Sequence, residues 1–65
     1  MTWEDRFDKA VWLNTQAGLA LLAGAFDRAA AYYAEASQYA ATAGGRRVLI
    51  EKAVDARARV MEAGR

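Results

Sequence analysis

The feature that most constrains the fold is the run of small residues between positions 13 and 36, LNTQAGLALLAGAFDRAAAYYAEA. Gly24 divides this run, and glycine commonly ends a helix because it adopts a left-handed backbone conformation without strain. After Gly24, apolar residues recur at helical spacing, at Phe26, Ala29, Tyr33 and Ala36. A period of three to four residues places these side chains on one helix face. The run therefore predicts two antiparallel helices that approach almost backbone to backbone.

Composition limits what else the chain contains. The sequence has 65 residues and a net charge of +1, and it lacks cysteine, histidine and proline. A chain of this length forms one domain, residues 1–65, near the lower size limit for independent folding. Without cysteine or histidine there is no disulfide, no thiolate metal site and no imidazole base. We therefore expect no metal and no cofactor. Because proline, which breaks helices, is also absent, we expect an all-α domain.

Apolar segments of the chain are short. The longest apolar run, Ala17–Phe26, is about half as long as a membrane-spanning helix. The first residues, Met1–Asp5, are acidic and are not followed by the apolar core of a signal peptide. We expect a cytoplasmic protein that makes no membrane contact. The bias toward alanine, arginine and glycine favours a bacterial or phage source.

Three helices are predicted, at residues 2–23, 26–43 and 46–63, and we expect them to form a small three-helix antiparallel bundle. Thr2 is a suitable N-cap for the first helix. Gly24 ends that helix, and Gly44-Gly45 ends the second and permits a sharp reversal.

Each predicted helix has one apolar face that points inward. On the first helix this face consists of Trp3, Phe7, Ala10, Leu13, Ala17, Ala20 and Leu21. On the second it consists of Phe26, Ala29, Tyr33, Ala36 and Ala40, and on the third of Leu49, Ala53, Ala56 and Val60. The many alanines predict a thin core, with the closest helix approach at Ala17, Ala20 and Ala29.

Residues Ala10–Ala41 resemble one tetratricopeptide (TPR) repeat. The positions that carry the resemblance are Leu13, Ala17, Ala20, Ala29, Tyr33 and Ala36. Two positions depart from the family pattern, since Ala25 replaces the usual polar cap and Ala41 replaces the closing proline. The resemblance implies a helical hairpin that binds another protein, followed from Gly44 by a capping helix. Arrays of such repeats generally contain about three copies, and this chain has one.

The whole chain is also similar to the microtubule-interacting-and-trafficking (MIT) domain, which adds a third helix to a TPR-like hairpin. The segment Ile50–Ala63, IEKAVDARARVMEA, is similar to the last helix of that family. This second resemblance implies that grooves beside the third helix receive short motifs of partner proteins.

No group of residues in the sequence forms a recognisable catalytic site. The stretch Gly44-Gly45-Arg46-Arg47 lacks the preceding strand and the GKS/T ending of a phosphate-binding loop. No histidine is present and no lysine is placed to activate Ser37, Thr15 or Thr42 as a nucleophile. We therefore expect a protein that is not an enzyme.

Arg46 and Arg47 allow two interpretations. Cations at a helix N-terminus oppose the helix dipole, so the two side chains either reach back to cap the carbonyls that end the second helix or contact an anion such as nucleic acid. Nucleic-acid binding is disfavoured because the net charge is small and no aromatic residues are interleaved with the basic ones between Arg46 and Arg59.

Several apolar residues fall outside the predicted inner faces. Trp12 and Leu19 lie one heptad apart on the outer side of the first helix, and Tyr32 and Tyr39 repeat this spacing on the second. Paired exposed aromatic or apolar side chains of this kind are typical of protein interfaces.

A second apolar stripe is predicted on the third helix, at Ile50, Val54 and Met61. Arg57 lies between this stripe and the inner face. Because an unpaired buried charge costs several kcal/mol, we expect its stem to be buried and its guanidinium to reach water.

Together these patterns predict a non-catalytic protein-interaction module that binds a protein partner and forms a homodimer. Two alternatives stay open. The chain could be a monomeric inhibitor or adaptor, of the small kind that phages encode, which binds a cellular target. It could also bind nucleic acid through the Arg46–Arg59 face.

Overall fold

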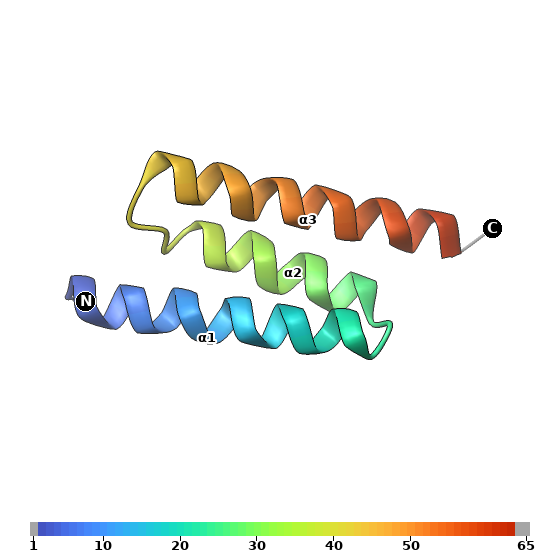
Figure 1. Cartoon of the computed structure of the whole chain (residues 1–65), viewed down its shortest axis with the longest axis horizontal. Helices are drawn as coiled ribbons and strands as arrows, with labels where there is room; N and C mark the ends of the chain where they lie inside the picture. Colours follow the sequence, from blue (N-terminus) through green and yellow to red (C-terminus); the bar gives the residue numbers. More distant parts are fainter. Residues whose placement is uncertain (1, 64–65) are drawn as a thin grey trace.

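The computed structural model describes residues 2–63, without the side chains of Trp3 and Ala63. It contains three helices, α1 (Trp3–Leu22), α2 (Phe26–Ser37) and α3 (Ala43–Ala63). Successive helices run in opposite directions (Figure 1), which confirms the predicted all-α, three-helix antiparallel bundle. The predicted inward position of Trp3 falls on a side chain outside the described residues.

Both predicted signals at the ends of α1 are confirmed. The hydroxyl of Thr2 accepts a hydrogen bond from the backbone N–H of Asp5 at 3.2 Å, which satisfies one free amide of the first turn. Gly24 follows α1 with φ 76°, in the left-handed region. Its N–H donates to the carbonyl of Leu21 at 3.0 Å, and the next N–H, of Ala25, donates to Ala20 at 2.8 Å. These bonds close the helix and turn the chain into α2.

The predicted boundary between the second and third helices is wrong. Helix α2 ends at Ser37 rather than Ala43, and Gly44-Gly45 lies inside the first turn of α3. The hydroxyl of Thr42 accepts from the N–H of Gly45 at 2.9 Å, so Thr42 supplies the N-cap of α3. The start of α3 is therefore set by a capping threonine, and the two glycines do not break the chain.

The three helices form a thin layer. Helix α2 lies between α1 and α3 and packs against both, while α1 and α3 hardly touch each other (Figure 1). The Cα atoms span 43 × 20 × 14 Å. The accessible surface of 4720 Å² exceeds the roughly 4,000 Å² of a compact monomer of 7.1 kDa. The helices thus enclose little interior.

Alanine dominates that interior. The central cluster consists of Ala17, Ala20, Ala29, Ala30, Tyr33 and Ala56, with Leu49 and Ala53 of α3 packed against it. Among the described residues, Leu13 is the largest side chain that is fully buried. The predicted close approach at Ala17, Ala20 and Ala29 agrees with this burial. The thin alanine core is confirmed.

Two residues of the predicted inner faces lie at the surface instead. Phe7 of α1 is 53% exposed and Val60 of α3 is also exposed. Helix α2 has 12 residues, against 20 in α1 and 21 in α3. At about 1.5 Å per residue, α2 is roughly 12 Å shorter than α1. It therefore cannot cover both longer helices along their whole length.

Candidate interaction surfaces

Large apolar side chains gather at the surface of this layer rather than inside it. Among the described residues, those that are exposed are Phe7, Val11, Trp12, Leu19, Leu22, Val48, Ile50, Val54, Val60 and Met61. Most fall on three surfaces. We name them the outer face of α1, the α2–α3 groove and the α1–α3 groove.

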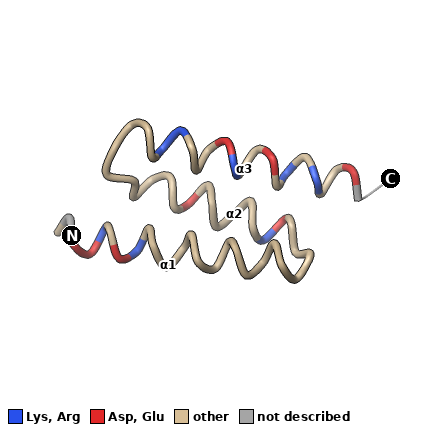
Figure 2. The backbone as a smooth tube through the Cα atoms, in the orientation of Figure 1, with Lys and Arg blue, Asp and Glu red and all other residues tan. Residues whose placement is uncertain are grey.

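The outer face of α1 contains Trp12 and Leu19, as predicted, together with Val11 and Leu22. Their exposed fractions are 52% for Trp12, 55% for Leu19 and 87% for Leu22. Helix α1 forms one edge of the layer, and no helix covers its outer side (Figure 1). Its charged residues are confined to the first two turns (Figure 2).

Trp12 contacts two residues of its own chain, Tyr32 and Lys9. Its ring meets the ring of Tyr32 edge-on, with centroids 6.3 Å apart and an interplanar angle of 88°. The ammonium nitrogen of Lys9 lies 5.9 Å from the Trp12 ring centroid. These contacts fix the orientation of the indole on the flank of α1 and leave about half of it accessible.

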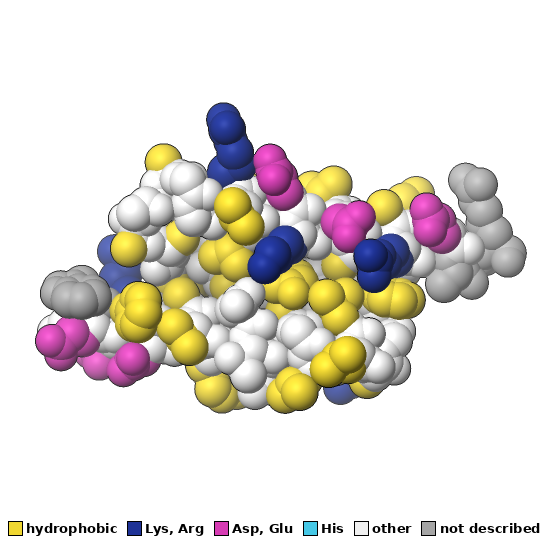
Figure 3. Space-filling view, in the orientation of Figure 1, with side chains coloured by type: hydrophobic (Ala, Val, Ile, Leu, Met, Phe, Trp, Pro, Cys, Tyr) yellow, Lys and Arg dark blue, Asp and Glu magenta, His cyan; other side chains and the backbone are white. Residues whose placement is uncertain are grey.

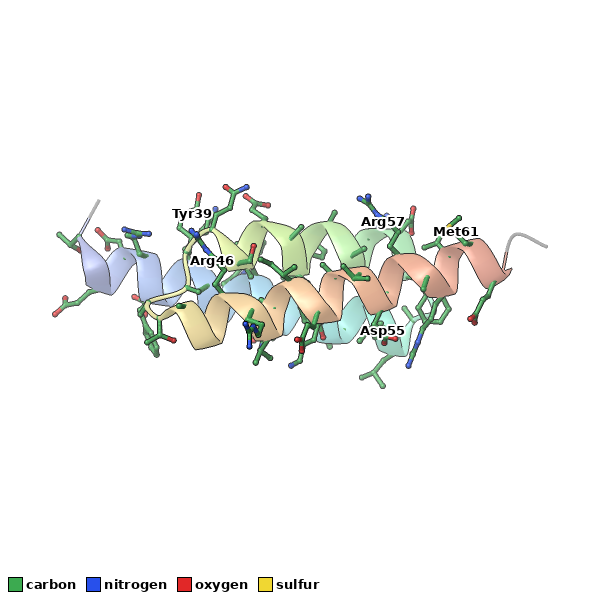
Figure 4. The ribbon with its side chains drawn as sticks, turned by 90° about the horizontal axis from the view of Figure 1, so that it is seen from above. Tyr39, Arg46, Asp55, Arg57 and Met61 are labelled. Atoms are coloured by element: carbon green, nitrogen blue, oxygen red, sulfur yellow. The ribbon has the colours of Figure 1, made fainter. Side chains whose placement is uncertain are left out.

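The α2–α3 groove contains the predicted second stripe of α3. It is a depression of about 270 Å³ lined by Ala30, Ala34, Ser37, Ile50, Ala53, Val54 and Arg57. Arg57 and Met61 lie on the same side of α3, opposite Asp55 (Figure 4). Arg57 is exposed at the edge of the groove, and the alanines of α2 form its opposite wall.

Tyr39 does not lie on a helix. It follows the end of α2, in the segment that leads to α3. There it lines a hollow together with Arg6 and Phe7 of α1. The predicted pairing of Tyr32 and Tyr39 along one helix is therefore wrong, because α2 ends before Tyr39.

The α1–α3 groove was missed by sequence reasoning. It has a volume of about 410 Å³, and its apolar lining includes Phe7, Val11, Val48 and Leu49. Figure 3 shows hydrophobic side chains in a band between α1 and α3. Basic groups lie over aromatic rings of α2 nearby, since the Lys52 nitrogen is 5.6 Å from the Tyr33 ring. The Arg59 guanidinium is 5.7 Å from the ring of Phe26.

The two arginines at the start of α3 behave differently. The Nε of Arg46 donates to the carbonyl of Ser37 at 3.3 Å, which is the bond that the capping interpretation predicts. A third arginine, Arg6 of α1, also reaches this end of α2. Its Nη2 donates to the carbonyl of Gln38 at 3.4 Å. The side chain of Arg47 makes no hydrogen bond or ion pair within residues 2–63.

The basic residues of α3 do not share one face. Arg46 and Arg57 lie on the side opposite Asp55 (Figure 4), whereas Lys52 and Arg59 contact rings on the α1–α3 side. Arg59 also forms an ion pair with Asp55 at 3.6 Å. The predicted Arg46–Arg59 face is thus divided around the helix.

Two chemical features are absent from the part of the chain that the structure describes. It holds no cluster of three or more acidic side chains arranged to bind a metal ion. None of its helices combines the length and apolar character that crossing a bilayer requires.

Comparisons with protein-family models, with curated proteins and with solved structures find no match. The TPR and MIT resemblances are therefore expectations from the sequence, compatible with the observed three-helix architecture.

Proposed function

We propose that this protein is a non-catalytic protein–protein interaction module that acts as a homodimer through apolar surfaces outside the hairpin core. The observation that carries the proposal is the inverted distribution of apolar side chains: alanines fill the interior, while Trp12, Leu19 and Met61 are exposed. On this proposal, α1 and α2 are the TPR- or MIT-like hairpin that the sequence resembles, and the module works in the cytoplasm.

Energetics support a second copy as the partner. Small domains retain little net stability, and burial of apolar surface stabilises by about 25 cal/mol per Å². A standard interface removes roughly 800 Å² from each partner, which is close to the surface that this chain exposes beyond a compact monomer of its mass. Dimerisation would therefore supply burial that the thin core lacks.

A second candidate function is that of a monomeric adaptor or inhibitor of a cellular protein. The α2–α3 groove favours it, because exposed Ile50 and Val54 face a wall of alanines there. Nucleic-acid binding has weaker support, since Arg46 is hydrogen-bonded to Ser37, and Lys52 and Arg59 lie over aromatic rings of α2.

Sedimentation equilibrium of the purified chain at tens of micromolar tests the proposal. We expect a mass of two chains of 7.1 kDa each. The midpoint of thermal unfolding should also rise with protein concentration, because folding and association are coupled. A single-chain mass without this concentration dependence would reject the homodimer, and pull-down with the monomer would then test the adaptor function.

A further inference from the structure

The outer face of α1 has the pattern of a helix-pairing surface. At 100° per residue, Asp8, Thr15 and Leu22 lie along its centre line, directly opposite the buried side chains that face α2. Val11 and Gly18 flank this line on one side, and Trp12 and Leu19 flank it on the other. The resulting spacing of three and four residues is the repeat by which two helices pack together.

This face is also unusually apolar for the exposed side of an edge helix. No charged residue occurs from Ala10 to Leu22, although such a face normally carries charged side chains. The hydroxyl of Thr15 donates to the carbonyl of Val11 at 2.9 Å, so its hydrogen is already bonded within the helix. Burial of Thr15 would therefore leave no donor unsatisfied.

We propose that the outer face of α1 binds the same face of a second copy, with the two α1 helices antiparallel and the two-fold axis at Thr15. This inference rests on the proposed homodimer and specifies its interface. In this antiparallel register the same flank of each helix meets, so Trp12 of one copy lies opposite Leu19 of the other. On the other flank Val11 of one copy lies over Gly18 of the other, which has open space where a side chain would begin, so the Val11 side chain fits there as a knob in a hole.

The distribution of charge selects the antiparallel arrangement. Glu4, Asp5 and Asp8 all lie in the first two turns of α1. A parallel pair would place these carboxylates side by side, whereas the antiparallel pair sets the two Asp8 residues about 20 Å apart, at 1.5 Å per residue. It also brings Asp8 toward Arg28 of the other copy, which lies beside Leu19 and Ala23 at the far end of the hairpin.

A face that binds itself forms a closed dimer. When the same patch is used by both copies, two-fold symmetry ends the assembly at two chains. The α2–α3 groove lies on another side of the layer and stays accessible in this dimer.

Single introduced cysteines test the geometry, because the chain has no cysteine of its own. In the full-length protein, Thr15→Cys would place two thiols at the two-fold axis, within the roughly 7 Å between Cα atoms that a disulfide allows. We expect mild oxidation to convert Thr15→Cys to a covalent dimer. Val54→Cys, an exposed residue on another surface, is the matched control and should remain largely monomeric on a denaturing gel.

Leu22→Cys separates the two helix directions. In the antiparallel dimer the two introduced thiols of this variant are about 20 Å apart and should not cross-link, whereas a parallel dimer would cross-link at both 15 and 22. Cross-linking at 22, or at 54 in place of 15, would overturn the inference and leave the homodimer standing. If Thr15→Cys has native helix content by circular dichroism and a dimeric mass but does not cross-link, the proposed interface is also wrong and the homodimer still stands. A monomeric mass of the unmodified protein would reject both.

Discussion

Arg46 and Ser37 join the start of α3 to the end of α2. The Nε of Arg46 donates to the Ser37 carbonyl at 3.3 Å, and Ser37 is the last residue of its helix. A cation is unfavourable at the beginning of a helix and favourable at the end of one. By reaching back across the connection, Arg46 places its charge beside the negative end of α2.

Replacement of Arg46 by Gln should lower the free energy of unfolding by about 1 kcal/mol, because a charged donor to a helix C-terminus is lost. Arg47→Gln is the control, and we expect a change within about 0.5 kcal/mol because Arg47 makes no such bond. Urea denaturation of both variants measures the difference. Equal effects would show that the Arg46 bond contributes nothing. The double variant should retain dimerisation.

Three glycines should respond to alanine in different ways. Gly24→Ala should destabilise by about 1–2 kcal/mol, because Gly24 has φ 76°. Gly44→Ala should stabilise by about 0.5 kcal/mol, since this residue lies in the first turn of α3 with open space for a Cβ. Gly45→Ala should stabilise the domain less than Gly44→Ala does, because the added Cβ would lie 3.1 Å from the Thr42 hydroxyl oxygen. Thermal unfolding midpoints rank the three variants, and an opposite order for Gly24 and Gly44 would contradict the helix boundaries.

Much of the fold follows from helical periodicity, but the connection between α2 and α3 does not. The alanine-rich sequence from Ala34 to Ala43 has high helix propensity, so local preference predicts that α2 continues. In the structure its last turn tightens instead, with N–H groups of Gln38 and Tyr39 donating to carbonyls three residues earlier, both at 3.0 Å. The Thr42 cap and the hydrogen bonds from Arg6 and Arg46 then stabilise the break. The two arginine bonds join separate segments, and helical periodicity cannot reveal them.

The same limit applies to the surfaces. The exposure of Trp12 and Leu19 agrees with helix geometry because both lie on the outer side of α1. The exposure of Phe7 and the α1–α3 groove depend on how far α2 extends, and the sequence pattern overestimates that length.

Overpacking of the contact between α1 and α2 should destabilise the domain. Ala20 is buried in the core cluster, so Ala20→Leu should cost about 1–3 kcal/mol. Ala31→Leu makes the same change on an exposed position of α2 and should alter stability by less than about 0.5 kcal/mol. Chemical denaturation at one protein concentration compares them. Similar stability of the two variants would show that Ala20 does not limit the approach of the helices.

Truncation of Trp12 should separate association from folding. Because about half of this side chain is free to meet a partner, Trp12→Ala should weaken dimerisation about 30-fold or more, or about 2 kcal/mol, as aromatic interface anchors commonly do. Loss of the edge contact with Tyr32 should cost the isolated subunit only about 0.5–1.5 kcal/mol. Far-UV circular dichroism should therefore show nearly unchanged helix content, while sedimentation shows a shift toward monomer.

Ile50→Ala, which shortens a side chain that is 45% exposed in the α2–α3 groove, is the control and should leave the dissociation constant within about threefold. An unchanged dissociation constant for Trp12→Ala would remove Trp12 from the interface, and an equal loss in both variants would mean that the dimer also uses the α2–α3 groove.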